Sequence, residues 1–208
     1  MLADTTFIEV EDHGAGSAVI KTNKRQVHKI AASSLKHKKY ARLLYRIADH
    51  YRPHNIIELG TSFGISTAYM ANGNPAAEVF TVEGAASVAS IAKHNFNELG
   101  LKNIHSLNGN FDEVLPSLLQ ETGKAGMIFI DGNHRKEPTL KYFNLFVNHS
   151  TPSSILIFDD IYWSRGMEEA WAEIKQHPSV TLTIDLFFMG LVFFNPDFKN
   201  RQHFKIRF

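Results

Sequence analysis

The sequence predicts a doubly wound α/β fold, in which helices cover both faces of a mostly parallel sheet. Short apolar runs bounded by turn residues alternate with longer segments of helical periodicity, which is the pattern of βαβ units. The last two apolar runs have no helical segment between them, and two helical segments come before the first run. We therefore expect N-terminal helices, a parallel sheet and an antiparallel last strand.

Seven apolar runs are predicted to be strands: 55–59, 78–82, 103–107, 126–130, 154–158, 180–185 and 191–195. Five helices are expected between them, at 66–71, 87–99, 112–120, 138–148 and 166–176. The last two strands are separated by residues 186–190 alone, which is too short for a crossover helix, so they should pair as a hairpin. Two amphipathic helices are expected at 27–35 and 41–48, before Pro53 ends the helical pattern.

Composition and charge favour an ordinary globular protein. The chain has 208 residues, no linker-like stretch, 22 basic against 21 acidic residues and no cysteine. A net charge of +1 provides no general attraction for nucleic acid or anionic membrane, and the N-terminus lacks the apolar run of a signal peptide. We expect a single cytoplasmic domain without a membrane partner. A local basic patch, which an ordinary solvated helix face also explains, comprises Lys21, Lys24, Arg25, Lys29, Lys36, Lys38, Lys39 and Arg42.

The turn after the first strand is the first candidate binding element, because ligands of open parallel sheets bind beyond the carboxyl ends of the strands. It contains Gly60, Gly64 and, two residues before the first glycine, Glu58. Glycines allow close backbone approach, and the following helix offers its N-terminal amides. The spacing is not that of the Gly-x-Gly-x-x-Gly dinucleotide motif, and the acid favours an amine-bearing ligand. A tight turn without a ligand explains it equally well.

The second and third strands end in residues that suit a nucleoside. Glu83 could accept hydrogen bonds from both hydroxyls of a ribose, or it could simply precede a helix. Asn110 and Phe111 could line an adenine site, although a polar loop that caps the next helix through Asp112 explains them too.

Three carboxylates follow the fourth and fifth strands: Asp131, Asp159 and Asp160. Clustered carboxylates must be protonated, paired or bridged by a cation, and oxygen ligands suit Mg²⁺ or Ca²⁺. The alternative is a metal-free pocket in which Asp131 or His134 is a general base. Tyr162 and Trp163 lie just beyond and could form a stacking wall for an aromatic or acyl substrate.

Five segments in order, ELGTSFGIST, TVEG, LNGNFDEVLP, FIDGNH and ILIFDDIYW, resemble the class I S-adenosylmethionine-dependent O-methyltransferases. The nearest similarity is to the catechol and caffeoyl-CoA type and its small bacterial relatives, over about residues 55–195. The resemblance implies a Rossmann-like core at 53–208 and an N-terminal helical arm of the same domain at 1–52. It also implies a small-molecule acceptor and makes a homodimer an expectation.

The resemblance assigns a role to individual residues. It implies contacts to S-adenosylmethionine from Glu58, Gly60, Ser62, Gly64, Ser66, Glu83, Asn110, Phe111 and Asp131. Metal-dependent members would hold a divalent cation such as Mg²⁺ at Asp131, Asp159 and Asp160. The sequence departs from the family at Asp160, where those members have Asn, and lacks their lysine shortly after the fourth-strand Asp.

Asp131 and His134 are the expected catalytic residues. Methyl transfer is an in-line displacement that needs alignment and removal of the acceptor proton. A divalent ion would acidify the acceptor hydroxyl, and His134 could take its proton. Two other functions stay open: a nicotinamide-dependent oxidoreductase, disfavoured by the missing dinucleotide motif, and a non-catalytic nucleoside-binding module with a protein or RNA partner.

Overall fold

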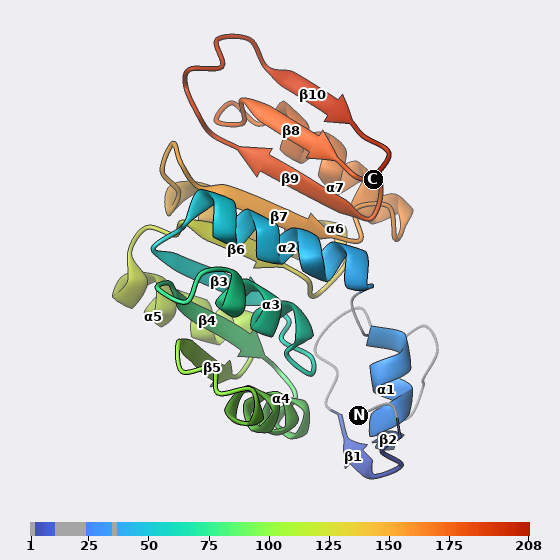
Figure 1. Ribbon diagram of the computed structural model, residues 1–208. Coiled ribbons are helices and arrows are strands. Elements are labelled where there is room, and N and C mark those ends of the chain that lie inside the picture. The colour runs from blue at the N-terminus through green and yellow to red at the C-terminus, as the bar shows by residue number, and fades with distance from the viewer. Residues whose placement is uncertain (1–2, 11–23, 35–36) are drawn as a thin grey trace.

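The computed structural model describes residues 3–10, 24–34 and 37–208 (Figure 1). The N-terminal elements are β1 (Phe7–Glu9), β2 (Lys24–Gln26), α1 (Val27–Ser34) and α2 (Lys38–Tyr51). They are followed by β3 (Asn55–Leu59), α3 (Ile65–Gly73), β4 (Glu78–Glu83), α4 (Ala86–Glu98), β5 (Ile104–Asn108), α5 (Phe111–Thr122), β6 (Met127–Ile130), α6 (Lys136–Asn148), β7 (Ile155–Asp159), α7 (Arg165–Gln176), β8 (Leu182–Asp185), β9 (Met189–Phe193) and β10 (Gln202–Lys205).

The main sheet confirms the predicted fold class and corrects the number of strands. Its order is β10-β8-β9-β7-β6-β3-β4-β5, and only β9 runs antiparallel to its neighbours β7 and β8. The predicted hairpin is therefore confirmed, but among the described residues the sheet has eight strands, not seven. The additional strand β10 is exposed along its whole length, so it has no buried apolar run that would reveal it in the sequence.

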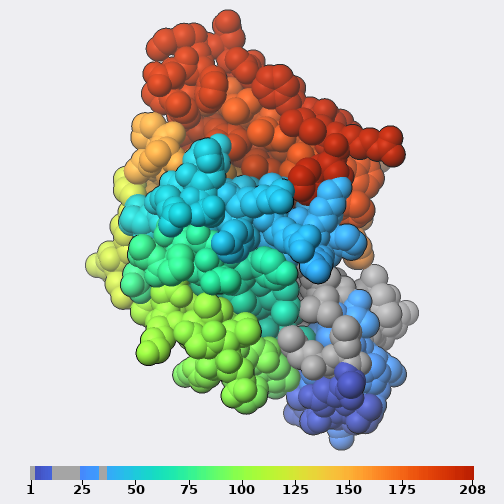
Figure 2. Space-filling view, viewed as in Figure 1, coloured from blue at the N-terminus to red at the C-terminus, as the bar shows by residue number. Residues whose placement is uncertain are grey.

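The sheet is buried on both faces because its strands are apolar at successive positions. Alternate strand residues point to opposite faces, so Ile57 and Leu59 join the cluster packed by α5, α6 and α7, whereas Ile56 joins the one packed by α2 and α3. Figure 2 shows α2, in blue, crossing one face between the C-terminal strands and the green N-terminal half of the core.

The N-terminal elements form a small unit beside the core. The antiparallel pair β1–β2 was not predicted, whereas α1 and α2 agree with the two expected helices. Val27, Ile30 and Ala31 share a buried cluster with Phe63 and Val88, from the turn before α3 and from α4. Two residues of the predicted basic patch, Lys21 and Lys36, lie outside the described residues.

The strand order reverses at β3, which fixes where a ligand can bind. Strands β4 and β5 lie on one side of β3, and β6 and β7 lie on the other. Two connections thus leave in opposite directions from the carboxyl ends of β3 and β6, which form the switch point of the sheet. Within the described ranges, the model contains no helix with the length and apolar character that crossing a membrane requires.

Candidate active site

The glycine turn after β3 is packed against the turn after β6. The backbone N–H of Asp131 donates to the carbonyl of Leu59 (2.8 Å). The backbone N–H of Gly60 donates to the carbonyl of Val82 (3.0 Å). Gly60 has a φ of +98°, and a Cβ there would overlap the carbonyl oxygen of Asp131; at Gly64 (φ +80°) a Cβ would overlap the ring of Phe96. Glycine is therefore required at both positions, because neighbouring atoms of the protein occupy the space that a Cβ would need.

Glu58 lies beneath this turn and is fully buried. Its carboxylate accepts hydrogen bonds from Ser66 Oγ (2.5 Å), Thr81 Oγ1 (2.6 Å) and Thr67 Oγ1. Hydrogen bonds to a charged group stabilise by about 1.5–3 kcal/mol each, so Glu58 links β3, β4 and the first turn of α3. Glu58 and Ser66 are hydrogen-bonded to each other, and their predicted contact with the methyl donor stays a prediction.

Glu83 is the acid that lies beside the glycine turn. It is partly buried at the end of β4, where its carboxylate accepts hydrogen bonds from the backbone N–H groups of Ser62 (2.8 Å) and Ala85 (3.1 Å). Ser62 has a left-handed backbone (φ +49°), which is costly for a residue with a side chain. The structure thus brings Glu83, Ser62 and Gly60 together, and their contact with the donor stays a prediction.

The loop after β5 joins the same edge of the sheet. The Asn110 side chain accepts a hydrogen bond from the N–H of Asp112 (2.9 Å) and is the N-cap of α5, so the cap is Asn110 and not Asp112, which lies in the first turn. The Phe111 ring packs against Gly132 and meets Tyr142 edge to face at 5.8 Å. Burial raises the pKa of Tyr142 to about 12, so its hydroxyl keeps its proton near neutral pH.

Asp131 and His134 form a pair at the end of β6. Nε2 of His134 lies 3.7 Å from Oδ1 of Asp131, and both side chains are about one-fifth exposed (22% and 19%). Between them, Asn133 has a φ of +55°. Asn adopts this left-handed region more readily than most residues, and the turn places an imidazole nitrogen beside a carboxylate at the carboxyl end of β6.

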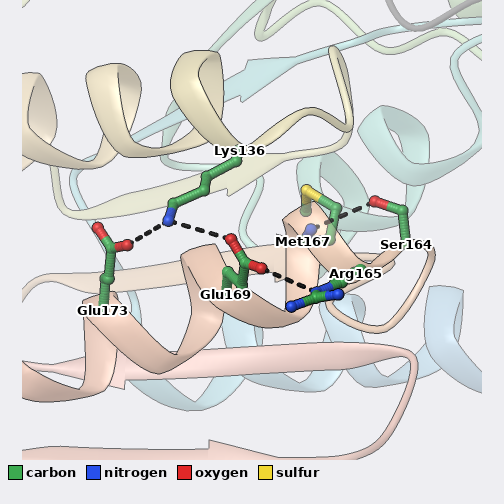
Figure 3. A network of polar contacts seen from close by, with 6 residues as sticks. All are labelled: Lys136, Ser164, Arg165, Met167, Glu169 and Glu173. Carbon is green, nitrogen blue, oxygen red and sulfur yellow. Dashed lines mark hydrogen bonds and ion pairs between the residues drawn. The ribbon is translucent and has the colours of Figure 1, made fainter.

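Lys136, which follows the pair in sequence, points toward Glu169 and Glu173 (Figure 3). Its Nζ lies 2.5 Å from Glu173 and 3.2 Å from Glu169, both on α7, and Glu169 also pairs with Arg165. Hydrogen bonds to Glu173 and Glu169 raise the pKa of Lys136. This lysine connects α6 to α7.

The predicted metal ligands lie on neighbouring strand ends but do not form a metal-binding group. Asp131 follows Ile130, which pairs with Phe158, so Asp131 and Asp159 occupy adjacent positions on β6 and β7. Asp159 is buried, and the N–H of Asp160 donates to Phe188 (2.6 Å). Across 3–10, 24–34 and 37–208, no three His, Cys, Asp or Glu side chains are arranged to hold a metal ion. The divalent cation at Asp131, Asp159 and Asp160 therefore stays a prediction.

Aromatic side chains dominate the site beyond β7. Trp163 is exposed, and the Tyr162 hydroxyl donates to Asp185 (2.6 Å). The sequence analysis did not single out Phe187 and Phe188, in the β8–β9 turn, nor Tyr40 of α2, whose ring lies 5.7 Å from that of Phe188. Burial and the charge of Asp159 raise the pKa of Tyr40. Two adjacent phenylalanines in a short hairpin turn were the available sequence signal.

A protein-family comparison decides the family. Residues 57–161, half of the chain, match the model of a methyltransferase domain, and this range runs from β3 to just beyond β7. The chain belongs to this methyltransferase family. The match includes Glu58, the glycine turn, Glu83, the Asp131–His134 pair and Asp159.

Individual relatives of this methyltransferase are similar over part of their length. A catechol O-methyltransferase of Niastella koreensis is 32% identical over 123 residues, which are 58% of this chain and 55% of that protein. A catechol O-methyltransferase of Mycobacterium tuberculosis is 24% identical over 166 residues, or 79% of this chain and 71% of that protein. The chain thus spans about half the length of the Niastella relative.

Solved structures share the fold. An O-methyltransferase from Bacillus cereus in complex with S-adenosylhomocysteine superposes with a TM-score of 0.67 at 22% identity, covering 80% of this chain and 88% of its own. An O-methyltransferase from Streptomyces achromogenes in complex with S-adenosylmethionine gives a TM-score of 0.70 at 18% identity, covering 80% and 86%. These likenesses confirm the fold class expected from the sequence.

Proposed function

We propose that this methyltransferase transfers the methyl group of S-adenosylmethionine to a hydroxyl group of a small molecule. The observation that carries the proposal is the Glu83 carboxylate, placed beside the glycine turn by the N–H of Ser62 at the switch point of the sheet. A carboxylate at that place suits the two hydroxyls of a ribose. The names of the relatives, which are O-methyltransferases, support a hydroxyl acceptor.

The residues at the ends of β3, β4 and β5 would hold the donor. Glu83 would bind the ribose, the turn from Gly60 to Gly64 would lie along the methionine part, and Phe111 would border the adenine. When bound, S-adenosylmethionine supplies an electrophilic methyl group on a sulfonium. The buried bonds of Glu58 keep this turn rigid, which pre-organises the donor site.

The residues after β6 would handle the acceptor proton. In this proposal His134 accepts the proton of the acceptor hydroxyl, and Asp131, 3.7 Å away, orients the imidazole and stabilises it once it is protonated. The acceptor lies on the β7 side of this pair. The divalent cation stays a prediction, and no step here depends on it.

We propose further that residues 1–52 are an arm of the same domain as the core at 53–208. The shared cluster of Val27, Ile30, Ala31, Phe63 and Val88 supports this, as does the hydrogen bond from Ser87 Oγ to the carbonyl of Glu9. Such an arm would lie beside the donor turn. The homodimer remains a prediction.

Calorimetric titration with S-adenosylhomocysteine tests the donor site. We expect micromolar binding by the wild type. In Glu83→Ala the affinity should fall at least about tenfold, because the two ribose hydroxyls of the bound ligand lose a charged hydrogen-bond acceptor. Glu78→Ala is the matched control, since Glu78 begins the same strand and pairs with His105 at the opposite edge of the sheet. A folded wild type that does not bind would overturn the proposal. Turnover with and without chelator then tests the predicted cation.

A further inference from the structure

We propose that the open edge of β10 binds an extended peptide in which acidic and apolar residues alternate, and that the peptide joins the main sheet as a further strand. Strand β10 ends the sheet, on the side away from β3, β4 and β5. The inference rests on this edge alone and does not depend on the proposed function.

The outer edge of β10 presents backbone groups to solvent. In the described part of the chain, β8 is the one strand that pairs with β10, and Figure 1 shows β10 at the rim of the sheet. The N–H groups of Gln202 and Ile206 donate to carbonyl groups at the two ends of the β8 segment (3.0 and 2.8 Å). Because the N–H groups of successive strand residues point to opposite edges, those of His203 and Lys205 point away from β8. Such an edge is a template for another strand.

The side chains of β10 divide into two rows, since alternate residues of a strand point to opposite faces of the sheet. Basic residues occupy every second position: Arg201, His203, Lys205 and Arg207. The positions between them hold Gln202, Phe204, Ile206 and Phe208, and the residues of both rows are exposed. The strand thus has a basic row on one face and a mainly apolar row on the other.

The basic row lies on the face that α7 covers. Arg201 Nη1 donates to the carbonyl of Gln176, the last residue of α7 (3.0 Å). Burial, and then the charges of Lys175 and Arg201, lower the pKa of His203. The charges that act most strongly on the middle of the row are therefore positive, and a carboxylate brought to this face would be attracted.

The apolar row lies on the face that α2 covers. Phe204 pairs in register with Ile184, which packs against the cluster beneath α2 and α3. Phe204 and Ile206 are 50% and 47% exposed, and the ring of Phe208 lies 5.8 Å from that of Tyr40 on α2. Adjoining large apolar side chains at this exposure indicate a surface that another molecule covers.

The two rows together specify the sequence of a partner strand. A strand paired with β10 places its side chains opposite those of β10, on the same two faces. Acidic residues at alternate positions would face the basic row with the same spacing of about 6.6 Å, and the residues between them would cover Phe204 and Ile206. Lys205 Nζ donates to the Tyr162 hydroxyl (3.3 Å), which fixes one ammonium in the middle of the row. In strand addition, main-chain bonds give affinity and alternate side chains give specificity.

The basic row argues against a second copy of β10 as the occupant. Two β10 strands related by a two-fold axis perpendicular to the sheet would place basic residues opposite basic residues, and like charges directly opposite are destabilising. Charged side chains on an edge strand protect it from pairing with its own copies. They leave the edge open to a strand of opposite charge.

A designed peptide tests the edge. The probe is a fluorescein-labelled octapeptide in which glutamate and valine alternate, titrated with the full chain at low ionic strength, where charge pairs are least screened. We expect a Kd of about 10–100 µM by fluorescence anisotropy. A peptide of the same composition, with the glutamates first and the valines last, should bind at least about fivefold more weakly, because it cannot match both rows.

Three results with these probes would overturn the proposal. The first is no binding of either peptide, and the second is equal binding of both. The third is an oligouridylate that binds as tightly as the alternating peptide, since the surface would then bind polyanions in general.

Reversal of the row tests the charge complementarity. Arg201→Glu/Arg207→Glu should weaken binding of the alternating glutamate peptide at least about tenfold and should bind an alternating lysine–valine peptide that the wild type does not bind. Lys93→Glu/Lys102→Glu is the matched control, because it changes the net charge equally at exposed positions on α4 and just before β5. Its affinity should stay within about twofold of the wild type. An equal loss in the two double variants would contradict the proposal.

A single change serves if the first double variant does not fold. Arg207→Glu keeps the bond of Arg201 to Gln176 and should still weaken binding of the alternating glutamate peptide about threefold.

Hydrogen exchange measured by NMR tests whether the peptide adds as a strand. At saturation, the amide N–H groups of His203 and Lys205 should exchange about fivefold more slowly. Those of Gln202 and Ile206, which already donate to the β8 segment, should be unchanged. Binding without protection at His203 and Lys205 would mean that the peptide contacts side chains only, and it would overturn the strand addition.

Discussion

The donor side and the acceptor side of the candidate site are built in different ways. On the donor side, at the ends of β3 to β5, buried polar groups are satisfied by neighbours within a strand and the helix that follows, as Glu58 is by Ser66 and Thr67. On the acceptor side, half-buried rings from α2 and the segment after β7 meet the exposed rings of Phe187 and Phe188 across long separations in sequence. The donor side is rigid through local contacts, whereas the acceptor side depends on the tertiary fold.

The largest expected effect comes from Gly60→Ala, which attacks the donor side. Its Cβ would overlap the Asp131 carbonyl and its φ is +98°, so we expect a loss of about 3 kcal/mol or more in the free energy of unfolding, together with weak donor binding. Gly100→Ala is the control: it also has a positive φ (+67°) but no neighbour within 4 Å, and it should cost about 1–2 kcal/mol. Urea unfolding measures both, and equal losses would contradict the packing argument.

Glu58→Gln should have the next largest effect, and it separates support of the donor turn from contact with the donor. The amide nitrogen cannot accept a hydroxyl proton, so at least one of the three hydroxyl groups loses its acceptor, at a cost of about 1–3 kcal/mol. Glu83→Gln should instead reduce donor affinity with a smaller effect on stability. If Glu58→Gln lost affinity at unchanged stability, direct contact with the donor would be the better explanation.

A smaller effect is expected on the pH dependence of stability, and it should leave the donor side and the acceptor side of the site unchanged. Burial and then the charge of Arg201 lower the pKa of His177, so the folded protein binds a proton there less readily than the unfolded chain. As the pH falls from above 6.5 toward the lowered pKa, only the unfolded state gains the proton, and stability falls. His177→Asn keeps an acceptor for the Ser179 N–H. It should make the melting temperature less dependent on pH between about pH 7.5 and 5.5.

The smallest effect is expected for Lys136→Gln. Its partners Glu169 and Glu173 are on α7 and largely exposed, and exposed ion pairs contribute little. We expect a slight fall in melting temperature and a kcat within about twofold of the wild type. His134→Gln, assayed beside it, should lower kcat by about 10²-fold or more. A large loss in Lys136→Gln would mean that this lysine, and not His134, serves the acceptor.

The same contrast explains what the sequence could predict. Strands β3 to β9, their helices, the hairpin and the grouping of Glu83 with the glycine turn follow from apolar periodicity and local turn chemistry, which act over a few residues. Strand β10 was missed because it buries nothing, and β1–β2 because three-residue strands give no pattern. The ring contact between Phe188 and Tyr40 joins residues far apart in sequence, and the bond between Asp185 and Tyr162 depends on strand order, so neither could be inferred from local spacing.

The contact between Gly60 and the Asp131 backbone also limits how this site can be engineered. The turn proposed to face the donor needs glycine at position 60, because the backbone after the neighbouring strand β6 occupies the place of a Cβ. Grafting residues 58–66 alone onto another scaffold would leave a void where that strand should be. The transferable module is therefore a pair of adjacent strands with both turns, β3 and β6 together, even though some seventy residues separate them along the chain.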